Sequence, residues 1–505
     1  MAACAPRIST PDVERRRAAQ QALSRAAGAP LVGGNAVDLL IDAPANYSAW
    51  LAAMRGARQR ILLENYIIRD DEIGREFLAV LVGRAEAGVR VHVIYDWLGC
   101  LGQSRASFWR PLIEAGGSVR CYNPFHIASP FGWINRDHRK LLLVDREVGF
   151  LGGICISTKW LGTGKDGTTW RDTAVSVRGP ALIEFEQAFA DVWSQLGSPL
   201  QPDTRMSAPF LAGDMDVRVV ATQPETAGMF RLDQMIAAMA QQSLWLADAY
   251  FVGVAPYVQA LAAAARDGVD VRLLVPGASD LPMVAAMSQS GYRALLEAGV
   301  RVFEWNGSMM HAKTAVADCR WARVGSSNLN VASWIGNCEL DIAVENIDFA
   351  QIMQQQYLRD LANATEIVLT PRQRVRRENP RAYVHRAGGS SGRAAASALR
   401  LAHSVGAALG NRRVFAESET RVLPWLVLPI FIFALIAMIW PRVLAWPIAV
   451  LAVWIGGALL GRYLRARRRR SAPAHDPVLQ LPGEPLSAPE TAIPRPRNVG
   501  TRKLT

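Results

Sequence analysis

Two histidines in matching surroundings carry the clearest chemical pattern in this chain of 505 residues. Each is followed by a lysine two residues later and by an aspartate seven residues later. Alternate residues of a strand point to the same side, so each histidine and its lysine are expected to share a face. A neutral imidazole can act as a nucleophile or as a general acid and base, and a lysine can neutralise phosphoryl oxygens. The first set is His138, Lys140 and Asp145, and the second is His311, Lys313 and Asp318.

Each set continues, at the same distance, into a segment of small residues. Residues 152–155 read GGIC and residues 325–328 read GSSN. A single His-x-Lys pair would be more typical of an ordinary surface or core histidine. The duplication at matched spacing, in a chain with 7 histidines, instead indicates an active site. The runs LLLV and TAVA between lysine and aspartate predict strands that enter the core, each ending at its aspartate.

An internal repeat surrounds these motifs and predicts the fold. RILLENYII, IGREFLAVLVGRAEAG and VRVHVIYDWLG in the first passage correspond to SLWLADAYF, VAPYVQALAAAARDG and VDVRLLVPGA in the second. Short β-branched runs alternate with amphipathic helices, which predicts an α/β fold with mixed sheets flanked by helices. We therefore expect two duplicated lobes, residues 30–200 and 201–370, packed about a pseudo-two-fold axis.

The paired H-x-K-x-x-x-x-D motifs resemble those of the phospholipase D superfamily. RDHRKLLLVD, FLGGICIS and WRDTAVSVRGPA are most similar to bacterial cardiolipin synthases, and the resemblance covers about residues 30–370. It implies a single active site at the lobe interface, where one histidine attacks phosphorus to form a phosphohistidine. The other histidine protonates the leaving alcohol and then deprotonates the incoming one. The resemblance assigns His138 as the nucleophile and His311 as the acid and base, an order that the sequence itself does not determine.

The resemblance also implies roles for residues around the histidines. Asp145 and Asp318 are expected to orient an imidazole, within one motif or across the two. Asn328, with Ser326, matches the family's G-S-x-N element and should hold the phosphate or a catalytic side chain. At the equivalent place in the first half the family commonly has Asn, whereas this chain has Cys155, a weak hydrogen-bonding group.

Three further acidic positions leave two interpretations open. Glu64 and Asp248 close corresponding strands, so either could face the active-site cleft or could equally be a strand-end acid in solvent. The segment 170–172, Trp-Arg-Asp, could bind a lipid headgroup or could hold a structural Arg–Asp pair.

The charge distribution argues against a nucleic-acid partner. The formal net charge is +12, but from residue 371 onward there are 22 Lys and Arg against 6 Asp and Glu, so residues 1–370 are nearly neutral. A nearly neutral body does not favour a nucleic-acid groove, and the basic tail favours an anionic partner such as phospholipid. The 6 cysteines form no C-x-x-C pair, so we expect no zinc site, disulfide framework or cofactor.

A long apolar run near the C-terminus predicts a membrane anchor. Residues 422–461 carry one charge, Arg442, and a bilayer needs roughly 20 residues per helix. We expect two transmembrane helices, about 423–440 and 443–460, rather than a buried helical pair. Arginines flank both ends, which predicts that both flanks, and with them the catalytic body, lie on the cytoplasmic side. The resemblance to bacterial cardiolipin synthases implies that this membrane is the bacterial inner membrane. The remaining segments are a partly helical leader at 1–29, a basic linker at 371–421 and a basic, disordered tail at 462–505.

Four functions compete at this stage. The first is phosphatidyl transfer that makes cardiolipin from phosphatidylglycerol and releases glycerol. The second is phospholipase D hydrolysis to phosphatidic acid, which would use the same residues. A phosphodiester nuclease and a non-catalytic lipid-binding protein are less favoured, because the body is nearly neutral and both motifs are intact. The sequence leaves the oligomeric state open.

Overall fold

The computed structural model describes residues 10–124, 135–162, 169–201, 210–224, 226–369 and 375–377, with scattered residues between 435 and 460. Two compact units divide the chain at residues 1–446 and 447–505, and the elements named below belong to the first. In the part of the chain thus described, no helix has the length and apolar character needed to cross a bilayer. The hairpin expected at 422–461 lies largely outside the described residues.

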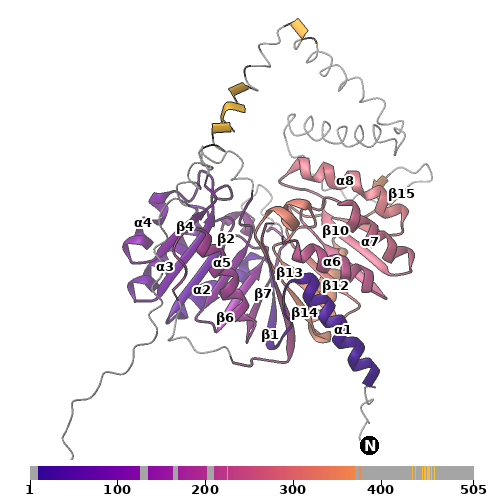
Figure 1. Ribbon diagram of the computed structural model, residues 1–505, viewed down its shortest axis with the longest axis horizontal. Coiled ribbons are helices and arrows are strands. Elements are labelled where there is room, and N and C mark those ends of the chain that lie inside the picture. Colours follow the sequence, from indigo (N-terminus) through magenta and orange to yellow (C-terminus); the bar gives the residue numbers. More distant parts are fainter. Residues whose placement is uncertain are drawn as a thin grey trace, which may run out of the picture. The chain divides into compact units, whose positions relative to one another are not determined.

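One sheet of 16 strands forms the centre of the first unit (Figure 1). Strands β1 and β8 pair antiparallel at its middle. Outward from β1 the order is β7, β6, β5, β2, β3, β4, and outward from β8 it is β14, β13, β12, β9, β10, β11, then β15 and β16. The second half thus repeats the strand order of the first, as two copies related by a two-fold axis would.

The strands of the first half are β1 (Val32–Ile41), β2 (Arg60–Asn65), β3 (Arg90–Asp96), β4 (Ser118–Tyr122), β5 (Lys140–Val144), β6 (Val148–Gly152) and β7 (Thr173–Arg178). Those of the second half are β8 (Met215–Thr222), β9 (Ser243–Ala247), β10 (Asp270–Pro276), β11 (Arg301–Trp305), β12 (Thr314–Ala317), β13 (Trp321–Gly325), β14 (Glu339–Glu345), β15 (Ala364–Leu369) and β16 (Val375–Arg377). The sheet is mixed, since β2–β3–β4 and β9–β10–β11 are parallel and the other pairs are antiparallel.

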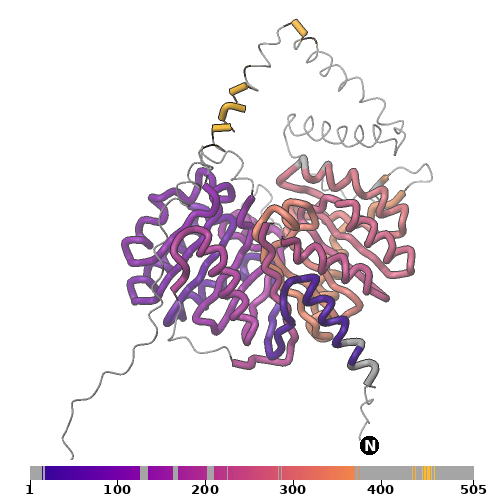
Figure 2. The backbone as a smooth tube through the Cα atoms, in the orientation of Figure 1, coloured from indigo at the N-terminus to yellow at the C-terminus, as the bar shows by residue number. Residues whose placement is uncertain are grey.

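Helices cover both faces of this sheet (Figure 2). In the first half α2, α3 and α4 share one apolar core, and in the second half α1, α6, α7 and α8 share another. Helices α5 and α9 contribute to a third core that contains strand residues of both halves, so this core is continuous across the β1–β8 junction. The α-helices are α1 (Thr10–Ala27), α2 (Asp42–Gly56), α3 (Glu72–Glu86), α4 (Ala106–Glu114), α5 (Leu182–Gln195), α6 (Gly228–Met239), α7 (Ala255–Arg266), α8 (Pro282–Glu297) and α9 (Ile347–Ala362).

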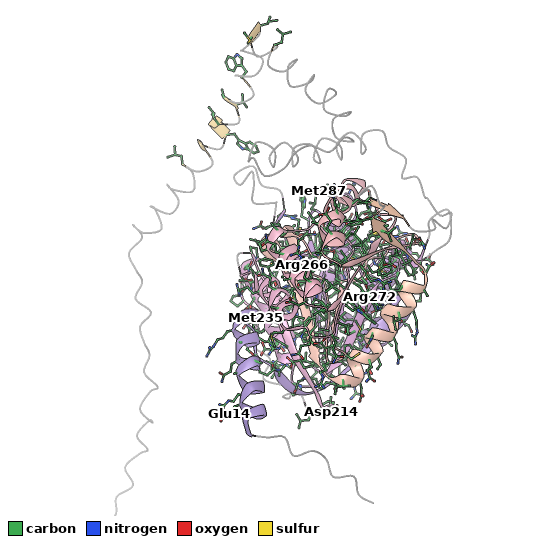
Figure 3. All side chains as sticks on the ribbon, turned by 90° about the vertical axis from the view of Figure 1, so that its right-hand side faces the viewer. Glu14, Asp214, Met235, Arg266, Arg272 and Met287 are labelled. Carbon is green, nitrogen blue, oxygen red and sulfur yellow. The ribbon has the colours of Figure 1, made fainter. Side chains whose placement is uncertain are left out.

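Local sequence explains how these elements begin and end, as α3 illustrates. Asp71 caps its first turn by accepting a hydrogen bond from the amide of Gly74 at 3.0 Å. Phe77 and Leu81, one helical turn apart, are both buried against the sheet. Gly88, just beyond the helix, has a φ of +85°, which glycine adopts without steric cost. In the second half, α1 packs on α6 through Leu23 and Ala27 in the C-terminal part of α1, and Figure 3 labels Glu14 at the opposite end of α1 and Met235 on α6.

The two motif strands lie deep in this sheet. Every residue of β5 (KLLLV) and β12 (TAVA) is buried, as expected for strands covered on both faces. They occupy equivalent places in the two halves, each between the β6 or β13 strand and the β2 or β9 strand. The α/β class, the mixed sheet and the covering helices predicted from the sequence are therefore confirmed.

Candidate active site

The histidines of the two motifs stand just before equivalent strands, and the backbone of each is bonded to the opposite half. The amide of His138 donates to the carbonyl of Cys338 at 2.9 Å, immediately before β14. The amide of His311 donates to the carbonyl of Arg171 at 2.7 Å, shortly before β7. Both residues are buried, with exposed fractions of 8% and 4%. Each histidine is thus fixed at the junction between the halves.

The carboxylates that orient the imidazoles also come from the opposite half. Nδ1 of His138 lies 2.9 Å from Oε2 of Glu339, at the start of β14. Nδ1 of His311 lies 2.8 Å from Oδ2 of Asp172, just before β7. We call these two pairs the crossed dyads. They are charge-assisted contacts of ordinary hydrogen-bond length.

Glu339 was not among the residues predicted from the sequence, and Asp172 was predicted only as part of the 170–172 segment; the strand register shows that the two acids are equivalent. In the β6–β7 pairing Ala174 lies opposite Gly152, and in the β13–β14 pairing Asp341 lies opposite Gly325. Two residues before Ala174 is Asp172, and two residues before Asp341 is Glu339. In the sequence, however, Asp172 follows Gly152 by 20 residues and Glu339 follows Gly325 by 14, so the equivalence of the two acids is visible only in the strand register.

The crossed dyads leave the second imidazole nitrogen available for chemistry. When Nδ1 donates to a carboxylate, Nε2 of a neutral imidazole carries the lone pair. Burial lowers the pKa of both histidines, and that of His311 falls to about 4, although the carboxylates oppose this effect. Burial raises the pKa of Asp172, but His311 and Lys313 outweigh it and hold the value at about 2. Each dyad is therefore a neutral imidazole beside an ionised carboxylate.

A third group holds each carboxylate in place. The hydroxyl of Ser326 donates to Oε2 of Glu339 at 2.6 Å and accepts from the Leu340 amide. The indole of Trp160 donates to Oδ2 of Asp172 at 3.0 Å. Ser326 was expected to hold the phosphate or a catalytic side chain, and the structure gives it contact with the acid that orients His138. Such supporting hydrogen bonds fix the orientation of the groups they contact.

The two motif lysines are buried and act on both histidines. Nζ of Lys140 donates to the carbonyl of His138, and Nζ of Lys313 donates to that of His311 at 2.5 Å. Burial and the nearby Lys140 lower the pKa of Lys313 to about 8, with Asp172 acting in the opposite direction. Lys313 also lowers the pKa of His138, and Lys140 lowers that of His311. The two motifs therefore share one local electrostatic field, as a single site requires.

The motif aspartates do not contact either histidine, contrary to the expected orienting role. The carboxylate of Asp145 accepts from the amides of residues 58, 59 and 60 at 2.6, 2.9 and 2.7 Å. Asp318 accepts in the same way from the amides of residues 241, 242 and 243. Seven residues of extended chain span about 20 Å, so each aspartate lies at the far end of its strand from the histidine. Asp145 thus holds the backbone at the start of β2, and Asp318 holds the backbone at the start of β9.

Glu64 lies neither in the cleft nor in solvent, so both alternatives for it were wrong. It pairs opposite Leu141, whereas Asn65 pairs opposite Lys140, which puts Glu64 on the other face of the sheet from Lys140. It is fully buried near Arg139, at 3.9 Å, and burial together with Asp137 raises its pKa well above the ordinary value.

Asp248 is buried on the lysine side, and its true counterpart is Asn65. Continuing the β9–β12 register puts Asp248 opposite Lys313. Its carboxylate accepts from the amides of Tyr250 and Leu329 at 2.9 and 2.8 Å, and burial raises its pKa to about 6. These contacts join the end of β9 to Leu329, which directly follows the 325–328 segment.

Three further residues that the sequence analysis singled out, Arg171, Cys155 and Asn328, are all buried. Arg171 forms a buried ion pair with Asp360 of α9, with contacts of 2.8 and 2.7 Å, which is the structural alternative. Cys155 is buried, and burial raises the pKa of its thiol. Asn328 is also buried, and its Oδ1 has no hydrogen-bond partner among the described residues.

Aromatic rings surround the imidazoles unequally. The ring of Tyr66 lies 4.8 Å from that of His138. His311 instead has three aromatic neighbours, Trp160 at 5.5 Å and Trp170 and Tyr250 at 5.7 Å. The two sides of the site are thus related in backbone but different in side chains. Within the described ranges, no group of three or more His, Cys, Asp or Glu side chains is arranged to hold a metal ion.

Comparison with known proteins identifies the family. A family model described as "Cardiolipin synthase, PLD-like domain" matches residues 233–361. The cardiolipin synthase of Alkalihalophilus pseudofirmus is 32% identical over 345 residues, which cover 67% of this chain and 68% of the relative. Cardiolipin synthase A of Pseudomonas fluorescens is 31% identical over 360 residues, covering 69% and 73%.

A solved structure supports the fold. The phosphatidylserine synthase of Haemophilus influenzae matches with a TM-score of 0.53 at 15% identity, covering 68% of this chain and 91% of that one. The resemblance inferred from the motifs is confirmed. The chain belongs to the cardiolipin synthase family of phospholipase D-like proteins.

Proposed function

We propose that this enzyme transfers a phosphatidyl group between phospholipids and makes cardiolipin from two molecules of phosphatidylglycerol. The observation that carries the proposal is the pair of crossed dyads, which hold two neutral imidazoles beside two shared lysines. Family membership supports the same reaction, since the relatives named above are cardiolipin synthases.

The first step forms a phosphohistidine. Nε2 of His138 attacks phosphorus and the bond from phosphorus to the glycerol oxygen breaks. His311, which takes up a proton on Nε2 once the anionic substrate is bound, gives that proton to the glycerol oxygen. Lys140 and Lys313 neutralise the phosphoryl oxygens, which is the main contribution that a protein makes to phosphoryl transfer. Glu339 stabilises the positive charge that develops on His138 as the bond forms.

The second step reverses these roles. His311 takes the proton of the incoming terminal hydroxyl, its oxygen bonds to phosphorus, and the bond from phosphorus to Nε2 of His138 breaks. The free imidazole and cardiolipin result. In the resting enzyme His311 is neutral, and the anionic phosphate between the lysines would favour its protonation by offsetting their charge. Asn328, with its unpaired buried oxygen, is proposed to contact the substrate.

Hydrolysis to phosphatidic acid is the second candidate function, because water could replace the incoming hydroxyl at His311. The aromatic rings around His311 favour transfer, since they limit the room for free water there. The nuclease alternative has less support, because the body is nearly neutral and the relatives named above are cardiolipin synthases.

We also propose a membrane location for the enzyme. The apolar run at 422–461 supports a two-helix anchor, and the flanking arginines support a cytoplasmic catalytic body. We separately propose residues 30–200 and 201–370 as the limits of the two lobes.

Incubating the purified enzyme with labelled phosphatidylglycerol tests the reaction. Formation of cardiolipin with an equal amount of glycerol is expected. Phosphatidic acid as the main product would favour hydrolysis instead. Absence of either product, together with cleavage of DNA, would contradict the proposed function.

A further inference from the structure

One carboxylate near the site, Asp280, has no part in the chemistry described so far. It follows β10, and its Oδ1 accepts a hydrogen bond from the hydroxyl of Tyr250 at 2.6 Å. The ring of Tyr250 lies 5.7 Å from that of His311, so Asp280 stands one tyrosine away from the imidazole. The other oxygen, Oδ2, accepts from Nζ of Lys159 at 2.9 Å.

This contact joins the two halves on the His311 side of the site. Lys159 belongs to a short 3₁₀ helix of the first half (Thr158–Leu161), whereas Asp280 belongs to the second. Lys159 also stands over the ring of Trp170, 4.1 Å from its centroid. Side-chain exposures of 34% for Lys159 and 29% for Asp280 leave both charges within reach of a substrate.

On the His138 side, the position equivalent to Asp280 carries no charge. Asp280 is the fourth residue after β10, and the fourth residue after β3 in the first half is Cys100. Its buried thiol bonds to the backbone, accepting from the Ile68 amide at 3.2 Å and donating to the Tyr66 carbonyl at 3.6 Å. The carboxylate therefore lies on the side where, in the proposed reaction, alcohols leave and enter.

Asp280 has unused capacity to accept hydrogen bonds. An ionised carboxylate offers about four acceptor positions, two on each oxygen. Among the described residues, Tyr250 and Lys159 use one position on each oxygen, which leaves one on each. Burial raises the pKa of Asp280, but Lys159 and the Tyr250 hydroxyl outweigh it and hold the pKa below the ordinary value. The group is therefore ionised and can only accept.

We infer that Asp280 and Lys159 recognise the glycerol headgroup of the phospholipid and so determine which alcohols His311 serves. This inference rests on the function proposed above. The leaving glycerol of the donor carries two neighbouring hydroxyls, which donate one to each oxygen of Asp280. The acceptor keeps one free hydroxyl beside the reacting one, which donates to Asp280. Its phosphodiester binds the Lys159 ammonium, which has three donors.

The test compares substrates with and without the hydroxyls. In Asp280→Asn, kcat/KM for phosphatidylglycerol should fall about ten- to a hundred-fold, the usual effect of losing a hydrogen bond to a charged group. Release of phenol from an aryl phosphatidyl donor, with methanol as acceptor, should stay as in wild type. Glu366→Gln is a matched control, because Glu366 forms a similar, part-exposed ion pair with Arg301 at 2.8 Å on the outer strands. It should change neither reaction.

Lys159→Met provides a second variant that separates the two steps. It should lower cardiolipin formation more than glycerol release, since the donor headgroup needs Asp280 and the acceptor phosphate needs Lys159. Equal losses with both substrates in Asp280→Asn, or unchanged use of phosphatidylglycerol, would overturn the inference. If the wild-type enzyme releases glycerol but makes no cardiolipin, the result counts against the proposed function. Glycerol release by the variants would then still test the role of Asp280. Wild-type enzyme that releases no glycerol would overturn both.

Discussion

Removing the charge of Glu339 tests the crossed dyads most directly. In Glu339→Gln the side chain keeps its shape but no longer stabilises the positive charge on His138. The contact of 2.9 Å puts the two charges about 4 Å apart, where the interaction is about 4 kcal/mol at an effective dielectric constant of about 20. This corresponds to about a thousand-fold in rate. The amide can also donate to Nδ1, which would move the proton to Nε2 and block attack.

Phosphoenzyme formation is the quantity to measure. Rapid mixing with a labelled aryl donor, followed by quenching in alkali, would give the rate of phosphohistidine formation for each variant. The matched control is Asp145→Asn, a motif residue that the structure assigns to three backbone amides. It should lower the unfolding free energy by about 1–3 kcal/mol and leave the rate per folded molecule unchanged. A thousand-fold loss in Asp145→Asn, with normal rates in Glu339→Gln, would refute the crossed arrangement.

Four further expectations concern the histidines, metals and the membrane. An aryl donor should partly restore phosphoenzyme formation in His311→Ala, which lacks the general acid, but not in His138→Ala; the opposite pattern would reverse the two roles. The folded pKa of His311, about 4, lies below its unfolded value of about 6.5, so stability should fall by about 3 kcal/mol between pH 6.5 and 4. Acid unfolding of His311→Gln should show a weaker dependence, and an unchanged profile would contradict the neutral imidazole. Exhaustive chelation should leave activity intact, because the lysines supply the positive charge; recovery of lost activity with one divalent ion would disprove this. Deleting 422–505 should weaken membrane attachment in cell fractionation, and full retention in the membrane would show another anchor.

Local elements followed from the sequence because their determinants are local. The passages RILLENYII and SLWLADAYF became β2 and β9, and the intervening helices and following strands appear as α3, α7, β3 and β10. The positions of His138 and His311 before equivalent strands also followed, since a duplicated motif keeps its place in a duplicated fold.

Contacts between the halves could not be derived from spacing alone. Glu339 reaches His138 across 201 residues, and no local pattern distinguishes it from the motif aspartate. The motif aspartates looked catalytic because they recur at fixed distance, yet the same recurrence arises when each caps the start of a neighbouring strand. Glu64 was predicted at the position that Asn65 occupies opposite Lys140. An error of one residue in register moves a side chain to the other face of a sheet.

The crossed dyads also bear on when the enzyme becomes active during its synthesis. A chain emerging from the ribosome presents His138 long before Glu339, which follows it by 201 residues. Until the β14 segment is made, His138 has neither its carboxylate nor its backbone bond to Cys338. A nascent or truncated first half therefore carries a motif without its activating partner. Neither dyad can therefore form until residues of both halves have been made.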